Sequence, residues 1–406
     1  MNDSVQTRGE QMLALRKARM AAALPILRGG FRPFFLLAAA WAAFAVLAWL
    51  CAFLYGVPLA SGFAPLAWHR HEMLFGFVGA VIVGFLLTAI PNWTGRLPIA
   101  GAPLAALAAL WIAARLAVWF SGTPGLLPAF VLDVGFFVVV AAVAGREVIA
   151  AGNRNVPVVA MVVLFALADA WDYAAAAGLV AGEGTPARAA IALVVVLISL
   201  IGGRIIPSFT RNWMAKRGFA SGLPTQPGRF DMATIAATAA ALLGWLVFPL
   251  STLTAAALLA AGLLQLARLS RWRGWRIWSD PLVLVLHAGY AWIPLGLLLL
   301  GVSAGGAPVP ATAAIHALAA GAAATMILAV MTRATLGHTG RELRAGPATV
   351  ALYALVILGA ALRVLTGLGA MDYRFGLELS GGLWASGFAL FVLTYAPVLF
   401  RASKAK

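Results

Sequence analysis

Cysteine is almost absent from this chain of 406 residues, which contains only Cys51. A single thiol cannot close an intrachain disulfide or form a Cys-x-x-Cys motif. A disulfide framework and a thiolate metal cluster are therefore both excluded. Any metal site must use histidine, methionine or carboxylate ligands.

Charged residues are also scarce, at 10% of the chain, and acidic residues are the scarcest, with 13 Asp and Glu against 29 Lys and Arg. Hydrophobic residues make up 63% of the sequence, and the mean hydropathy is +0.95. Most of such a chain must be surrounded by lipid or by its own apolar helices. The composition predicts an integral membrane protein.

Apolar segments of about 20 residues, the length that crosses a bilayer, recur between clusters of Pro, Gly and Arg. They predict an all-α, polytopic membrane protein with about twelve transmembrane helices in a single membrane domain, residues 1–406. The loops between them are mostly short, so no separate soluble domain is expected. The expected spans are 34–54, 72–91, 102–121, 126–145, 156–180, 187–206, 232–250, 253–270, 282–301, 311–332, 348–366 and 382–400.

The basic residues predict the orientation of the chain in the membrane. Residues 1–33 are basic, and their apolar runs are too short for a signal peptide, so we expect a cytoplasmic N-terminal tail. This choice places 24 of the 29 Lys and Arg on the cytoplasmic side, as the positive-inside rule requires, and both termini are then cytoplasmic. The net charge of +16 is thereby explained by topology, and no nucleic-acid partner is expected. The five arginines left toward the outside are Arg70, Arg115, Arg188, Arg363 and Arg374.

Two stretches carry the same polar residues at the same spacing. In each, a histidine (His71, His316) is followed five positions later by a glycine (Gly76, Gly321), and 23 positions later by Thr-Gly-Arg. Residues 206–211 share part of the pattern without the histidine. We expect three four-helix repeat units, about 34–150, 151–275 and 276–406, around a pseudo-threefold axis with helices 2, 6 and 10 equivalent. The alternative for Thr-Gly-Arg is ordinary helix-end chemistry, a glycine stop followed by an interfacial cation.

The five histidines separate by depth in the membrane. His69, His71 and His316 fall in the outer half, whereas His287 and His338 fall in the inner half. A histidine inside a span is a functional hypothesis, against the alternative of an interhelical hydrogen bond. Because His71 and His316 occupy equivalent repeat positions, we expect them to ligate a haem b near the periplasmic face.

Residues two apart on a helix point in nearly opposite directions. If His69 is helical it cannot share an iron face with His71, so it should serve a second site. Together with the thioether of Met73, it suits copper or a second haem.

Charged residues inside the spans offer further candidates. Arg70, Arg115 and Arg363 could pair with haem propionates, or extend to the interface. The carboxylates in helices 4 and 5, Asp133, Asp169 and Asp172, could relay protons or pair with a neighbouring arginine. On the inner side, His287 could hold a second haem, a quinone or only a structural hydrogen bond.

Several longer runs of sequence resemble the NnrS family over essentially the whole chain. They are FRPFF (Phe31 to Phe35), WHRHEMLFGF (Trp68 to Phe77), IPNWTGRLP (Ile90 to Pro98), GGRIIPSFTRNW (Gly202 to Trp213), LHAGYAWIPLG (Leu286 to Gly296) and VMTRATLGHTGR (Val330 to Arg341). The resemblance implies a haem- and copper-containing bacterial inner-membrane protein linked to nitric oxide metabolism, denitrification and nitrosative stress. Nitric oxide or its nitrosyl-metal adducts would then be ligands, and a quinol or another donor would supply electrons.

The expected architecture is also similar, more distantly, to the catalytic subunit of haem-copper oxidases and nitric oxide reductases. There a low-spin haem lies between histidines of helices 2 and 10, as His71 and His316 would here. Helices 6 and 7 supply the copper-site histidines of those enzymes, and this chain has none in either. A conventional binuclear centre is therefore not expected. A secondary transporter and a non-enzymatic haem or metal carrier remain the competing functions.

Overall fold

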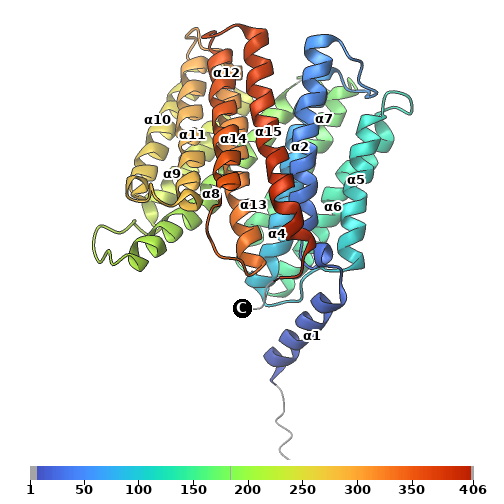
Figure 1. Cartoon of the computed structure of the whole chain (residues 1–406). Coiled ribbons are helices and arrows are strands. Elements are labelled where there is room, and N and C mark those ends of the chain that lie inside the picture. Colours follow the sequence, from blue (N-terminus) through green and yellow to red (C-terminus); the bar gives the residue numbers. More distant parts are fainter. Residues whose placement is uncertain (1–6, 183, 404–406) are drawn as a thin grey trace, which may run out of the picture.

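The computed structural model describes residues 7–182 and 184–403, and every regular element among them is helical. Twelve of these helices are long and apolar enough to cross a membrane, as expected (Figure 1). The chain is an all-helical, multi-pass membrane protein. The spans are α2 (Phe31–Tyr55), α3–η2–α4 (Pro65–His71, Glu72–Val78 and Gly79–Thr94), α5 (Ala102–Trp119), α6 (Leu126–Ala150), α7 (Val156–Ala176), α8 (Thr185–Lys216), α9 (Arg229–Val247), α10 (Thr252–Ser270), α11 (Pro281–Ala304), α12–η4–α13 (Ala311–His316, Ala317–Ala323 and Ala324–His338), α14 (Pro347–Gly367) and α15 (Tyr373–Phe400).

Three helix ends lie well beyond their expected positions, because polar residues continue the helix past the apolar segment. The second span begins at Pro65, seven residues before the expected start, so His69 is helical. Helix α8 continues ten residues further, to Lys216, through a basic segment. Helix α15 begins at Tyr373, after Asp372 accepts a hydrogen bond from the backbone N–H of Phe375. Hydropathy identifies the part of a helix that lies in lipid. Residues outside that part, such as the capping residue Asp372, determine how far the helix extends beyond it.

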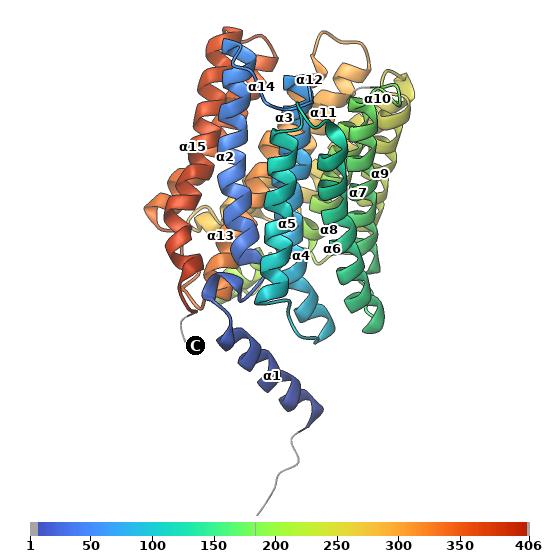
Figure 2. The same ribbon diagram turned by 90° about the vertical axis from the view of Figure 1, so that its right-hand side faces the viewer.

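Consecutive spans pack as antiparallel neighbours, and the first span, α2, lies beside the last, α15 (Figures 1 and 2). Since the number of spans is even, the described ends of the chain lie at the same end of the bundle. We call the opposite end the distal end. The amphiphilic segment α1 (Arg8–Ala22) lies outside the bundle at the end of the chain termini. It occupies part of the expected tail, whose residues 1–6 lie outside the described residues.

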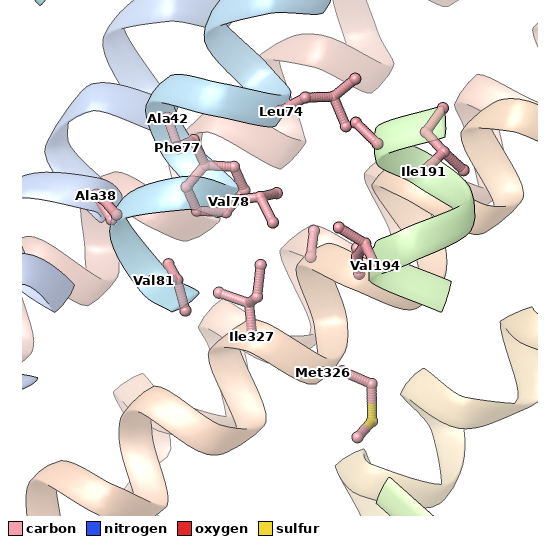
Figure 3. Packing of buried hydrophobic residues seen from close by; sticks show 14 of the residues in the cluster. Ala38, Ala42, Leu74, Phe77, Val78, Val81, Ile191, Val194, Met326 and Ile327 are labelled. Carbon is pink, nitrogen blue, oxygen red and sulfur yellow. The ribbon is translucent and has the colours of Figure 1, made fainter. Parts of the chain in front are cut away.

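The second and tenth spans, which carry His71 and His316, are the most enclosed helices of the bundle. In each, 72% of the most apolar stretch is buried, against 28% for α6. Near the middle of the bundle, Val78 and Val81 from η2 and α4 approach Val194 from α8 and Ile327 from α13 (Figure 3). Spans 2, 6 and 10 therefore meet in one apolar core. The division into three repeat units remains a prediction.

The same two spans share a local distortion that the sequence pattern did not reveal. A π-helical segment begins directly after each histidine, at Glu72 after His71 and at Ala317 after His316. Each segment is seven residues long. The equivalent span α8 is α-helical throughout. Because π segments inside α-helices are frequent at functional sites, the two histidines mark the same kind of structural position.

The repeated glycines and Thr-Gly-Arg motifs have packing and helix-end roles. A Cβ on Gly76 would lie 2.3 Å from the Glu72 carboxylate, and one on Gly321 would lie 2.5 Å from the Trp292 indole, so only glycine fits. Gly95 ends α4 in the left-handed conformation with φ +69°, and Gly340 adopts φ +70° just after α13. This geometry is ordinary helix-end chemistry.

Candidate functional site

A cavity of about 640 Å³ lies between the spans in the distal half of the bundle, and His69 and His316 both line it. His69 comes from α3 and His316 from α12, so the two imidazoles enter from different spans. The His69 ring stacks on Trp49 of α2, with ring centroids 4.2 Å apart. The cavity continues down to Val78, Val194 and Ala323, at the upper edge of the central apolar core.

Each of these two histidines has one ring nitrogen available for a ligand. His316 Nδ1 lies 2.7 Å from the carbonyl oxygen of Thr312, which can only accept, so Nδ1 carries the proton and donates. The Nε2 atom of His316 is then the unprotonated, metal-binding nitrogen, and the backbone fixes this tautomer. His69 Nδ1 is buried with no hydrogen-bond partner among the described residues. A buried imidazole without a partner is costly unless something else binds it.

Three arginines line the same cavity: Arg70, Arg188 and Arg363. Arg363 Nε and Nη1 are buried and have no hydrogen-bond partner among the described residues. Arg188 donates to the Thr185 hydroxyl at 2.8 Å. The sequence predicts an anion site with Arg70 and Arg363, but it places Arg188 only among the arginines toward the outside. The position of Arg188 at the distal start of an apolar span is the sequence feature that could have identified it as a cavity residue.

His71 faces away from the cavity and is completely buried. Its Nδ1 lies 3.0 Å from Asp172, and its Nε2 lies 2.9 Å from Asp133. The structure therefore does not bring the expected pair, His71 and His316, into one cavity. Residues two apart point to opposite sides of a helix, and it is His69, not His71, that points to the side of His316.

Arg115 is also absent from the cavity and lies among carboxylates instead. It forms an ion pair with Asp133, and its Nη1 donates to Glu72 at 2.6 Å. Trp41 donates to the same Glu72 oxygen at 2.6 Å. The expected propionate role of Arg115 is thus not available to it. The alternative, that a membrane carboxylate pairs with a neighbouring arginine, describes Asp133 and Arg115.

Two further predicted residues have different surroundings. Met73 lines the cavity one helical turn after His69, on the same face. His287 of α11 lies outside the cavity, and its Nε2 is 2.9 Å from the Thr210 hydroxyl of α8. This contact is the interhelical hydrogen bond offered as the structural alternative. The His338 ring packs beside that of Phe31, with centroids 5.4 Å apart and the two planes tilted by 35°.

The distal cavity thus combines features that ligand-binding sites share. Its walls are mostly apolar, and its polar groups are few and converge from separate helices. Two imidazoles and one arginine among them have polar atoms without a partner in the part of the chain that the structure describes. Such an arrangement can bind a planar or elongated ligand that carries both a metal and negative charge.

Comparisons with known proteins agree with the sequence motifs. A search of curated proteins found no match. The family model described as NnrS protein matches residues 25–403, from just before α2 to beyond α15. Since the match covers nearly the whole described chain, the protein belongs to the NnrS family.

Proposed function

We propose that this protein binds haem b in the distal cavity, where His69 and His316 would hold it, and that it acts on nitric oxide in redox metabolism or nitrosative stress. Family membership supports the link to nitric oxide. The ligand pair differs from the one expected from the repeat spacing by a shift of two residues, from His71 to His69.

One observation carries the proposal: two histidines from separate spans reach one cavity, and each has a ring nitrogen that no other described residue occupies. Bis-histidine haem sites in helical bundles need such a pair on facing helices. The Thr312 carbonyl orients His316 as a backbone carbonyl typically orients a ligating imidazole.

The remaining lining suits the rest of a haem. The cavity volume of about 640 Å³ falls within the range of about 300–1,000 Å³ that is common for cofactor and ligand sites. Apolar residues would cover the macrocycle, and Arg70, Arg188 and Arg363 would receive the propionates through charge-assisted hydrogen bonds. Arg363 supports this most directly, because its Nε and Nη1 have no partner among the described residues.

When bound, haem would supply one-electron chemistry and an iron able to bind nitric oxide. His69 and His316 would hold it through their ring nitrogens, and the hydrogen bond from His316 Nδ1 to the Thr312 carbonyl would keep the His316 ring oriented. A quinol or another donor would supply electrons.

Copper is the second cofactor that the site could take. His69, Met73 and His316 offer two imidazoles and a thioether in the same cavity, a set that suits Cu(I). In that arrangement haem and copper would compete for His69 and His316. Metal analysis together with optical spectroscopy separates the two.

We further propose the bacterial inner membrane as the location, with both termini cytoplasmic. The distribution of Lys and Arg supports this orientation. The distal cavity would then open in the periplasmic half of the membrane.

The test is an optical spectrum of the protein purified in detergent, oxidised and dithionite-reduced, with haem and copper quantified per polypeptide. We expect a reduced haem b spectrum that is lost in His316→Ala. His287→Ala is the matched control, because it removes a buried histidine that bonds to Thr210 and lies outside the cavity. Nitric oxide added to the reduced protein should shift the spectrum.

A colourless protein, produced with ample haem and free of copper, would overturn this proposal. A transporter or a non-enzymatic carrier would then be favoured, since an interhelical cavity with cations also suits an anionic cargo. Uptake of such a cargo into vesicles, impaired by Arg363→Gln, would support that function instead.

A further inference from the structure

A second cluster of polar groups lies on the other side of the histidine-bearing span from the cavity. His71, Asp133 and Asp169 each contribute one ligand atom, and all three atoms lie within 4.8 Å of one another. The three residues come from α3, α6 and α7, and each is fully buried. None of them lines the distal cavity.

The charges in this cluster do not balance. Four carboxylates share the region with one guanidinium, Arg115, and the imidazole of His71. Even with a cationic imidazole, the formal sum is two negative charges in excess. Unpaired charge inside a membrane costs several kcal/mol per group or more. The carboxylates are those of Glu72, Asp133, Asp169 and Asp172, which are 0%, 0%, 0% and 9% exposed.

Asp169 is the carboxylate of this cluster whose charge no described group compensates by a hydrogen bond or a close ion pair. Both of its carboxylate oxygens are buried without a hydrogen-bond partner among the described residues. Its Oδ1 lies 3.8 Å from His71 Nδ1, too far for a hydrogen bond. Asp133 and Glu72 are held by Arg115, whereas no arginine is described in contact with Asp169. A carboxylate oriented toward an imidazole at this distance leaves space for a shared cation.

The spacing of the ligand atoms fits a metal ion. His71 Nε2 and Asp133 Oδ2 lie 2.9 Å apart, and His71 Nδ1 and Asp172 Oδ2 lie 3.0 Å apart. Two ligands with metal bonds of about 2.0–2.2 Å are about 3 Å apart when the bonds meet near a right angle. An ion binds only one nitrogen of an imidazole, so an ion shared with Asp133 would lie at Nε2, and Nδ1 would keep its hydrogen bond to Asp172.

We propose that His71, Asp133 and Asp169 bind a divalent cation, while the hydrogen bond between His71 Nδ1 and Asp172 orients the imidazole. One imidazole with carboxylates suits ions that accept mixed nitrogen and oxygen ligands, such as Zn²⁺, Mn²⁺ or Fe²⁺. Tyr173 donates to Asp133 Oδ2 at 3.2 Å and would orient this ligand. The carboxyl group of Asp172 is the only part of the set with appreciable exposure, 12% of its side chain, and gives the ion a route in.

This ion would also act on the distal cavity through the helix that the two sites share. His71 and His69 lie on the same turn of α3. Fixing the His71 imidazole between α6 and α7 fixes the rotation of α3, and with it the direction of His69. The inference does not depend on the proposed haem site.

The test begins with the non-haem metal content of the purified protein, measured by mass spectrometry without chelators in the buffers. We expect about one divalent ion per polypeptide, lost in Asp169→Asn. This variant keeps the shape of the side chain and breaks no described hydrogen bond. Glu147→Gln is the matched control. It removes the charge of a carboxylate at the end of α6 that lies near the chain termini, where Glu147 pairs with Arg96 and Arg146, and this variant should retain the ion.

A binding experiment on the wild-type chain makes the test independent of the variant's folding. Protein treated with EDTA should bind Mn²⁺, detected by electron paramagnetic resonance, and Zn²⁺ should compete for the site and raise Tm. A haem-free protein that still holds the divalent ion would support this inference while overturning the haem proposal. Substoichiometric metal in the wild type, with no Mn²⁺ or Zn²⁺ binding after EDTA treatment, would overturn the inference and assign the excess charge to protonated carboxylates.

Discussion

His69 and His71 are two residues apart on one helical turn, yet their surroundings differ in almost every respect. His69 faces an apolar cavity in which the charged groups are arginines. His71 is enclosed by carboxylates and hydrogen-bonded at both ring nitrogens. The first environment favours an anionic ligand that brings its own metal, and the second favours a bare cation. The two sides of α3 thus present different environments, an apolar cavity with arginines on one side and a cluster of carboxylates on the other.

The largest effects should come from replacing each of these two histidines in turn. His69→Ala should abolish nearly all bound haem, whereas His71→Gln should retain haem and lose the divalent ion. The reason is that only His69 reaches the cavity that His316 lines. Haem absorbance and metal content per polypeptide measure both outcomes. The reverse result, haem lost with His71 and kept without His69, would restore the pairing suggested by the repeat spacing.

Removing the positive charge of Arg115 from the carboxylate cluster around His71 should destabilise the protein strongly. Arg115→Met leaves Glu72 and Asp133 buried without their shared partner, and breaking such a pair costs about 3–5 kcal/mol. We expect a marked fall in Tm and in yield. Arg374→Met is the control, because its ion pair with Glu378 is exposed and should contribute nothing measurable. Equal Tm values for the two variants would show that the cluster is not held by Arg115.

The close packing of Gly321, in the span that carries His316, against Trp292 predicts a smaller effect. In Gly321→Ala the new Cβ would lie 2.5 Å from the Trp292 ring, and overpacking of this kind costs about 1–3 kcal/mol. Thermal unfolding in detergent would measure it. In Gly382→Ala of α15 no heavy atom is within 4 Å, so that variant should be neutral or slightly stabilising. A stabilised Gly321→Ala variant would mean that Trp292 moves aside freely.

The smallest expected effect concerns the electrostatics of the cavity. Arg363→Gln should lower the haem midpoint potential, because a nearby positive charge favours the reduced iron. For a separation of about 10 Å at an effective dielectric constant near 20, the interaction is about 1–2 kcal/mol, or some tens of millivolts. A redox titration measures this change, with Arg211→Gln on the exposed proximal part of α8 as the control. An unchanged potential would place the propionates away from Arg363.

Composition and hydropathy were sufficient to predict the membrane fold, but not the direction in which each helix faces. All twelve spans were located, because lipid imposes a minimum apolar length on each one. Which side of α3 meets α12 depends on packing between residues far apart in the chain. The sequence therefore singled out the three histidines of the outer half, and local helix geometry predicted that His69 and His71 diverge. It did not reveal which of them faces His316.

The acidic cluster was predictable only in part, for a related reason. Carboxylates in apolar spans are conspicuous in a chain with 13 acidic residues, and pairing of one of them with an arginine was foreseen. The meeting of Asp133 from α6 with Asp169 from α7 around His71 is a matter of tertiary structure. The π segments were equally hidden, since Ala317–Ala323 contains only Ala, Leu and Gly.

Those π segments divide the second and tenth spans into two parts, one that carries the histidine and one that packs in the core. A wider turn holds an extra residue, and one residue corresponds to a rotation of about 100° in an α-helix. The distal part of the span, with its histidine, is thereby set at a different angle from the part that packs in the core. Ligand geometry and core packing can then change separately during evolution. Deleting one alanine from Ala317–Ala323 would couple them again, because it would turn His316 relative to the cavity while leaving its hydrogen bond to Thr312 within α12.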